Sequence, residues 1–174
     1  MKNYLKKNMK FKLLNPVFYC CIGISGSGKS TYINKIFERE VIVEPDAIRK
    51  EITGSVSDQS QDFKVWREVA DRVKKNLDTM GLAVLDATNT HSSLRTKFLK
   101  NIPEGVRKVA IVFTPKGTDE EIINKLYSRI EQDIKAGKDR STVPHEVVVR
   151  QLQQFKNGLQ TLDKQFDEIE HIAV

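Results

Sequence analysis

The sequence predicts an α/β fold, in which a central parallel sheet of about five strands carries helices on both faces. Short apolar segments alternate with longer amphipathic ones, and glycine or proline marks most of the boundaries between them. Polar motifs follow several of the apolar segments. Because parallel strands are joined by right-handed crossovers, we expect helices on both faces and a ligand site at the carboxyl ends of the strands.

Each element is expected from its own local pattern. The segment 17–24 is short, apolar and ends in a glycine-rich loop, which is typical of a buried strand. The expected strands are 17–24, 41–44, 82–87, 108–114 and 169–174. The expected helices are 29–38, 46–52, 61–80, 92–100, 118–136 and 145–166. Apolar residues at spacings of three and four define the core stripes of the long helices, with Phe63, Trp66, Val69, Val73, Leu77 and Met80 on the stripe of helix 61–80.

Composition indicates one globular domain, residues 16–174, preceded by a basic segment, residues 1–15. The chain has 174 residues and a net charge of +6, but residues 1–12 hold five lysines and no acid. The rest carries 24 basic against 23 acidic residues, so the charge alone argues only weakly for nucleic-acid binding. No apolar run reaches the roughly 20 residues of a membrane helix, and no secretion signal is evident. Adjacent Cys20 and Cys21 fit a buried strand in a reducing cytoplasm.

Residues 23–30, GISGSGKS, match the pattern G-x-x-x-x-G-K-[ST] at every fixed position and lie between an expected strand and an expected helix. Glycines let the backbone turn so that its N–H groups point at phosphate, Lys29 reaches the β- and γ-phosphates, and the Ser30 hydroxyl is a Mg²⁺ ligand. The alternative is a tight turn with a chance lysine. The pattern predicts a P-loop NTPase-type three-layer fold that binds ATP and Mg²⁺. The expected nucleotide-binding set is Gly23, Ser25, Gly26, Ser27, Gly28, Lys29, Ser30 and Thr31.

Charged residues also follow the second and third expected strands. Asp46 and Arg49 are three residues apart, so they share a helix face. Phosphoryl transfer to a hydroxyl needs a carboxylate that accepts the proton, and an arginine can hold an anionic acceptor. The alternative is an N-cap aspartate beside a surface arginine. Asp86 ends the third strand, where a magnesium-associated aspartate is expected, and Asn89 follows it. Asp86 and Asn89 are also candidates for acceptor contacts, or for a turn that caps the next helix.

A basic segment between the last two expected helices predicts a lid. Small phosphotransferases must exclude water from the reacting phosphate, and lid cations stabilise its charge. Arg129 lies on the helix that enters this segment, and Lys138 and Arg140 lie within it. The expected catalytic set is therefore Lys29, Asp46, Arg129 and Arg140, with Lys138 beside the nucleotide. A solvated basic loop is the alternative.

Together, these motifs resemble the kinase domain of phage-type polynucleotide 5′-hydroxyl kinases, over about residues 17–155. The motifs are GISGSGKST, EPDAIRKEI, VLDATN and the basic lid that leads into VP. The resemblance implies a nucleic-acid repair enzyme whose acceptors are DNA or RNA 5′ ends. It implies that Asp46 is the general base and that Arg49 holds the phosphate beside the acceptor. The phosphatase motif D-x-D-G-T that often accompanies this kinase is absent from the sequence.

Two other functions stay open at this point. A small-molecule kinase for a sugar, nucleoside or other metabolite is favoured by the nearly neutral body of the chain. A non-catalytic ATP-binding module, with a lysine-rich segment that recruits a partner, is a third hypothesis, but it gives no role to Asp46 and Arg49. The sequence indicates no preference between DNA and RNA and no oligomeric state.

Overall fold

The computed structural model of the chain describes residues 14–137 and 143–174. Most of the basic N-terminal segment and the two lid cations Lys138 and Arg140 lie outside the described residues. The strands are β1 (Val17–Ile22), β2 (Ile42–Val43), β3 (Leu82–Leu85), β4 (Arg107–Thr114) and β5 (Glu168–Ala173). The helices are α2 (Lys29–Ile36), α3 (Pro45–Thr53), α4 (Asp62–Met80), α5 (Ser92–Leu99), α6 (Asp119–Lys135) and α7 (His145–Leu159), with short 3-10 turns η1 (Arg39–Val41) and η2 (Leu162–Lys164).

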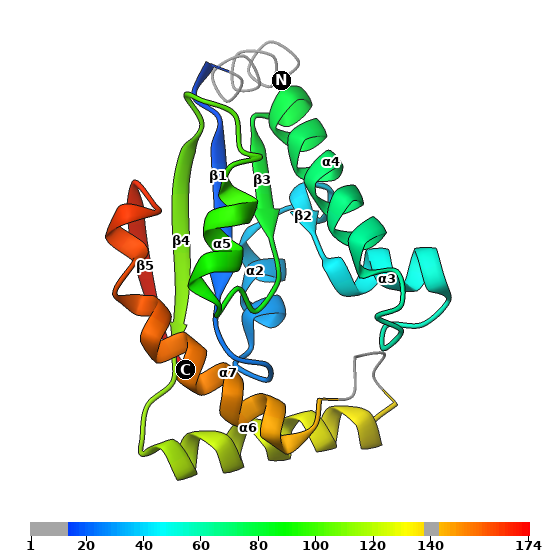
Figure 1. Cartoon of the computed structure of the whole chain (residues 1–174), viewed down its shortest axis with the longest axis vertical. Helices are drawn as coiled ribbons and strands as arrows, with labels where there is room; N and C mark the ends of the chain where they lie inside the picture. Colours follow the sequence, from blue (N-terminus) through cyan, green and yellow to red (C-terminus); the bar gives the residue numbers. More distant parts are fainter. Residues whose placement is uncertain (1–13, 138–142) are drawn as a thin grey trace.

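The five strands form one parallel sheet in the order β2-β3-β1-β4-β5, which confirms the predicted fold class (Figure 1). β1 lies at the centre, where Val17 pairs with Leu82 of β3 on one side and with Arg107 of β4 on the other. Strands β2 and β3 lie on one side of β1, and β4 and β5 lie on the other, so the direction in which strands are added reverses at β1. In open parallel sheets, a ligand binds at the carboxyl ends of the strands beside such a reversal.

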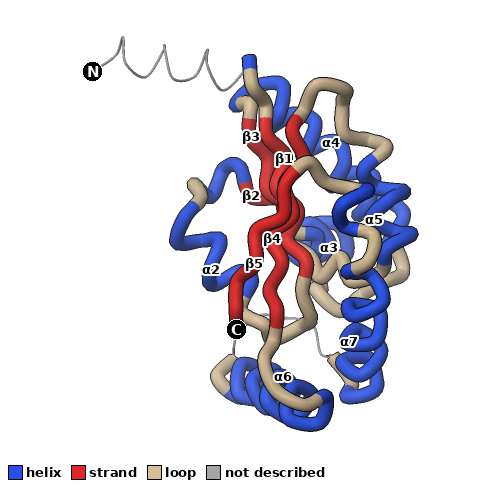
Figure 2. The backbone as a smooth tube through the Cα atoms, turned by 90° about the vertical axis from the view of Figure 1, so that its left-hand side faces the viewer, coloured by secondary structure: helices blue, strands red, loops and turns tan. Residues whose placement is uncertain are grey.

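Helices cover both faces of the sheet, and Figure 2 shows α2 on one side with α4, α5 and α7 on the other. Side chains alternate along β1, so Phe18, Cys20 and Ile22 pack in the core beneath α4 and α7, while Cys21 packs against Ile33 of α2. Burial raises the pKa of the Cys20 thiol to about 12. The two cysteines are therefore unreactive core residues, as their place in an apolar strand predicts.

Three boundaries or faces differ from those expected. α7 ends at Leu159, not near residue 166, because the chain turns into η2; Leu162 and Phe166 are still buried and keep the apolar spacing. α3 begins one residue earlier, with Glu44 as its N-cap residue, so Asp46 lies in the first turn. In α4, Phe63 is 82% exposed, and the buried face holds Val65 and Asn76 instead.

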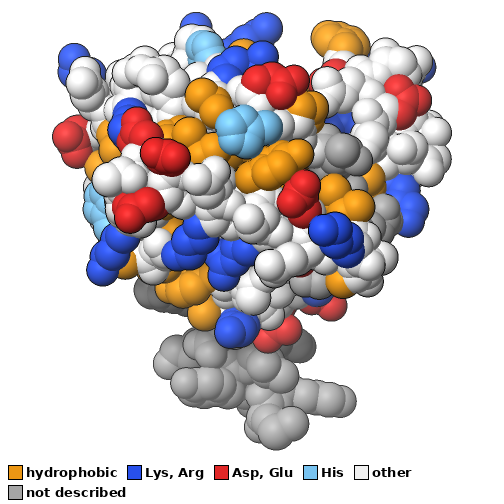
Figure 3. Space-filling model, turned by 90° about the horizontal axis from the view of Figure 1, so that it is seen from below, with side chains coloured by type: hydrophobic (Ala, Val, Ile, Leu, Met, Phe, Trp, Pro, Cys, Tyr) orange, Lys and Arg blue, Asp and Glu red, His pale blue; other side chains and the backbone are white. Residues whose placement is uncertain are grey.

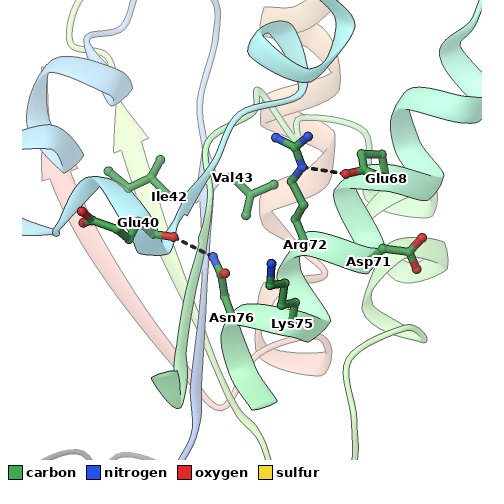
Figure 4. A pocket seen from close by; sticks show the side chains of 8 residues that line it. All are labelled: Glu40, Ile42, Val43, Glu68, Asp71, Arg72, Lys75 and Asn76. Atoms are coloured by element: carbon green, nitrogen blue, oxygen red, sulfur yellow. Dashed lines mark hydrogen bonds and ion pairs between the residues drawn. The ribbon is translucent and has the colours of Figure 1, made fainter. Parts of the chain in front are cut away.

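A pocket lies between the sheet edge at β2 and the helix α4, and it is lined mainly by charged side chains (Figure 4). Asn76 crosses its floor and donates a hydrogen bond from Nδ2 to the Glu40 carbonyl oxygen, at 3.0 Å. β2 has only two residues, so this bond fixes the edge of the sheet to the helix. The pocket lies apart from the glycine-rich loop and contributes nothing to the site described below.

No helix in the described parts of the chain is long and apolar enough to cross a membrane.

Replacing Asn76 with alanine is expected to lower the free energy of unfolding by about 0.5–1.5 kcal/mol, because the hydrogen bond from the Asn76 side chain to the Glu40 carbonyl is lost. Urea denaturation followed by circular dichroism measures this change. Lys75→Ala, an exposed change on the same helix, should stay within about 0.5 kcal/mol of the wild type. Equal stability of the two variants would contradict the anchoring role of Asn76.

Candidate active site

The glycine-rich loop follows β1 and leads into α2 at the carboxyl edge of the sheet. Gly26 and Gly28 have φ angles of +81° and +86°, a conformation that side chains with a Cβ rarely adopt. A Cβ on Gly26 would also lie 2.9 Å from the Leu126 carbonyl oxygen of α6. The glycines of the sequence motif are therefore required both by the turn and by the close approach of α6.

Lys29 lies inside this loop. Its Nζ donates to the carbonyl oxygens of Gly23 and Ile24, at 3.0 and 2.9 Å, and the side chain is buried. The loop thus surrounds the ammonium group with its own backbone at the N-terminus of α2, where anions bind most readily. The loop therefore holds one positive charge at the start of the helix, and the expected contact of Lys29 with phosphate stays a prediction.

Ser30 and Asp86 come together from α2 and the end of β3. The Ser30 hydroxyl lies beside the Asp86 carboxylate and lowers its pKa. The Asp86 backbone N–H donates to the Val43 carbonyl of β2, at 3.0 Å. Burial raises the pKa of Asp86; the Ser30 hydrogen bond and the Lys29 charge oppose that rise. A buried carboxylate beside a hydroxyl is a suitable oxygen donor set for a divalent cation.

Asp46 and Arg49 form an ion pair on the first turns of α3. Arg49 is buried, and it also donates from Nε to the Asp62 carboxylate at 3.2 Å and from Nη1 to the Val56 carbonyl at 3.3 Å. Asp46 is largely exposed, and its charge contributes to the raised pKa of Asp86. The pair therefore lies at the same end of the sheet as Ser30 and Asp86.

Arg129 reaches the loop from α6. Its Nη1 donates to the Gly26 carbonyl oxygen at 3.3 Å, and the rest of the side chain is exposed. This places one of the expected lid cations next to the glycine-rich loop. The other two expected cations, Lys138 and Arg140, lie outside the described residues.

Asn89 connects the loop after β3 to the central strand β1. Its backbone has a positive φ of 46°, and its Nδ2 donates to the Cys21 carbonyl of β1 at 2.8 Å. The amide donor is therefore committed to the sheet. The neighbouring Thr88 carbonyl accepts a hydrogen bond from the Gly23 N–H, at 2.9 Å, so this loop and the phosphate loop support one another.

Sequence reasoning missed Arg95, a buried cation on α5. Nη1 donates to the carbonyl oxygens of Asn89 and Thr90, at 2.7 and 3.0 Å, and Nη2 donates to Gly158 of α7, at 2.8 Å. Nε donates to Gln165, at 3.0 Å. Burial lowers the pKa of Arg95. The guanidinium thus connects the loop after β3 to the end of α7, and no carboxylate in residues 14–137 or 143–174 pairs with it.

Two glutamines of α7 continue this connection. Gln151 Oε1 accepts a hydrogen bond from the Ser25 N–H in the phosphate loop, at 2.9 Å. Gln154 Oε1 accepts from the Thr90 hydroxyl, at 3.3 Å. α7 therefore contacts both loops of the site. The only sequence signal for this was the position of two amides on an otherwise amphipathic helix, which does not by itself indicate a site.

Residues 19–157 match a protein-family model described as an AAA domain, AAA_33, and the chain belongs to that family. Together with the sheet order and the phosphate loop, this defines a P-loop kinase-like domain. No curated protein matches the chain.

Solved structures share the fold at low sequence identity. A chain of the Pnkp1/Rnl/Hen1 RNA repair complex matches with a TM-score of 0.70 and 21% identity, over 87% of this chain and 47% of that one. The chain thus spans about half the length of that relative. A toxin–antitoxin protein from Streptococcus pneumoniae, PezAT, matches with a TM-score of 0.58 and 17% identity, over 99% and 76%. A gluconokinase from Sinorhizobium meliloti 1021 matches with a TM-score of 0.53 and 18% identity, over 91% and 83%.

Asp86→Asn should make the protein more stable than the wild type at pH 7. A carboxyl group whose pKa is raised on folding carries an unfavourable burial term while it is ionised, and the neutral amide avoids that term. As the pH falls through the raised pKa of Asp86 toward its unfolded value near about 4, wild-type Asp86 is protonated and the advantage of the variant should vanish. Thermal unfolding at pH 4–7 tests this, and a less stable variant at pH 7 would contradict it.

Arg95→Met should lower the free energy of unfolding by roughly 3 kcal/mol, because the carbonyl oxygens of Asn89 and Thr90 lose their donor and each loss costs about 1–3 kcal/mol. Arg95→Lys should recover only part of this, since an ammonium group cannot span the same acceptors. Lys100→Met, an exposed change just after α5, is the matched control. Urea denaturation that shows the same stability for Arg95→Met and the control would refute the anchoring role.

Proposed function

We propose that the protein transfers the γ-phosphate of ATP to the 5′-hydroxyl of a polynucleotide. The observation that carries this proposal is the position of the Asp46–Arg49 pair. Asp46 is exposed at the carboxyl edge of the sheet, and it is close enough to influence the ionisation of Asp86, which binds Ser30 of the phosphate loop. A carboxylate at the same edge of the sheet as the phosphate loop is what transfer to a hydroxyl requires, whereas nucleotide binding alone does not.

The proposed reaction is an in-line displacement at the γ-phosphorus. Asp46 accepts the proton of the acceptor hydroxyl, whose oxygen forms the new bond to phosphorus while the bond to the leaving oxygen of ADP breaks. Lys29 and Arg129 stabilise the negative charge on the phosphoryl oxygens. Arg49 keeps Asp46 oriented through their ion pair, and its guanidinium supplies the positive charge on the acceptor side.

The residues at the phosphate loop fit a nucleotide-bound Mg²⁺ ion. Ser30 and Asp86 provide the oxygen donors, and among the described residues no group of three His, Cys, Asp or Glu side chains could hold a metal ion by itself. A bound Mg²⁺ would neutralise phosphate charge. Within the chain, the Ser30 hydroxyl and the Asp86 carboxylate would hold it.

The sequence motifs support a nucleic-acid acceptor, and a structural comparison supports the fold. The sequence motifs resemble those of polynucleotide 5′-hydroxyl kinases, and the fold is similar to that of a chain from an RNA repair complex. At 21% identity the second comparison supports the fold, and the acceptor is inferred from the motifs.

A small-molecule kinase is the second candidate, and it is favoured by the distribution of charge. Seen from the side of α6, Lys, Arg, Asp and Glu side chains are interspersed and form no continuous basic track (Figure 3). The fold is also similar to that of a gluconokinase. A neutral acceptor would need no such track, so the acceptor must be tested directly.

Asp46→Asn should lower the rate of phosphate transfer to a 5′-hydroxyl oligonucleotide by about 10²–10⁴-fold, the usual contribution of a general base, and should leave ATP binding unchanged. Transfer from [γ-³²P]ATP measures the rate, and titration with a fluorescent ATP analogue measures binding. Asp71→Asn makes the same chemical change at an exposed position of α4 and should retain full activity. A fully active Asp46→Asn variant would refute the role of Asp46.

If the wild type binds ATP but transfers labelled phosphate to gluconate or a nucleoside in preference to the oligonucleotide, the small-molecule kinase hypothesis replaces the proposal. If no acceptor is labelled, the chain is an ATP-binding module.

A further inference from the structure

An exposed apolar ridge lies on the outer side of α4 and α5. It consists of Phe63, Trp66 and Leu94, which are 82%, 38% and 65% exposed. Large aromatic side chains with this much exposure are uncommon in the first turn of a packed helix, and a contiguous exposed apolar surface marks a contact site. None of the three residues contributes to the active site described above.

The three side chains belong to one surface. The Trp66 ring packs edge-on against Phe98 of α5, with ring centroids 5.9 Å apart, so Trp66 faces α5. Phe63 lies three residues before Trp66 on α4, and Leu94 lies four residues before Phe98 on α5. Residues three or four apart share a helix face, so Phe63 and Leu94 flank the Trp66–Phe98 contact.

The ridge begins next to the proposed acceptor pair. Phe63 directly follows Asp62, whose carboxylate accepts a hydrogen bond from Arg49 at 3.2 Å. Helices α4 and α5 both start at the carboxyl edge of the sheet, and Figure 2 shows both on the face opposite α2 (Figures 1 and 2). A strand with its 5′ end at Asp46 therefore has the ridge immediately beside it.

Cations accompany the apolar side chains. Arg67 lies four residues after Phe63, and Lys97 lies three residues after Leu94; both are exposed. The opposite flank of α4 differs, because there Arg72 is paired with Glu51 and Glu68. Aromatic rings next to positive charges are the usual means of binding single-stranded nucleic acid, since the rings stack on bases and the cations contact phosphates.

We propose that this α4–α5 ridge binds the nucleotides that follow the 5′ terminus of a single-stranded acceptor, with a base stacked on Phe63. The inference rests on the proposed function and narrows it to single-stranded ends. A metabolite or mononucleotide acceptor has no further nucleotides to bind the ridge, so affinity should increase with the length of the strand.

Trp66 makes the test direct, because it is the only tryptophan of the chain and lies in the ridge. Its fluorescence should be quenched when a single-stranded 5′-hydroxyl decamer is added without ATP. Phe63→Ala should weaken this binding about 10-fold, as expected for the loss of one stacked base, and should leave the KM for ATP unchanged. Ile36→Ala, an exposed apolar change on α2 across the sheet, is the matched control and should bind like the wild type.

Two further measurements strengthen the test. The wild-type KM should be lower for the decamer than for a dinucleotide, and Phe63→Ala should remove that difference without changing kcat. In the Arg67→Gln, Lys97→Gln double variant, the slope of log K against log salt should become shallower by about 1.4, since each single-strand phosphate contact contributes about 0.7.

The outcomes separate the two proposals. Unchanged decamer affinity and length dependence in Phe63→Ala, with normal phosphate transfer, would overturn the ridge and leave the kinase assignment standing. Loss of quenching in Phe63→Ala, in a protein that labels no oligonucleotide, would support the ridge and overturn the assignment. A Phe63-dependent dimer seen by analytical ultracentrifugation would overturn the ridge as a nucleic-acid site.

Discussion

The site depends on one buried guanidinium. Arg95 donates to the loop after β3 and to the end of α7. Within the described residues, its partners are backbone carbonyls and the side chains of Gln165 and Thr161. The contact is close on both sides, since a Cβ on Gly158 would lie 2.7 Å from the Thr90 carbonyl oxygen. Such a network holds its groups in one arrangement because a partly satisfied buried charge is costly.

This arrangement supports the phosphate loop from two sides. The loop held by Arg95 supports Gly23 through Thr88, and α7 supports Ser25 through Gln151. The loop after β3 and α7 therefore form one scaffold for the proposed nucleotide site. Against this rigid frame, Asp86 carries an unfavourable burial term, which a bound divalent cation would relieve. A buried carboxylate that lowers the stability of the fold in this way is typical of a functional site.

Much of the fold was predictable from the sequence, because parallel strands that are buried on both faces read as short apolar runs. The phosphate loop was predictable as well, since its glycines are required by backbone geometry at Gly26 and Gly28. The exposed face of α4 was not, because Phe63 continues the apolar spacing yet points away from the core. Spacing identifies a helix face but does not distinguish burial from a binding surface. Arg95 escaped notice because its partners are backbone carbonyls, which leave no trace in a sequence pattern.

The most direct test of the central claim is the chemical position of the transferred phosphate. Two oligonucleotides of identical sequence, one with a 5′-hydroxyl and one with a 5′-phosphate, would be incubated with the protein, ATP and Mg²⁺, and the products examined by mass spectrometry. The account predicts one added phosphate on the first, located at its 5′ end, and none on the second. Equal phosphorylation of both, or of neither while ATP is bound, would contradict it.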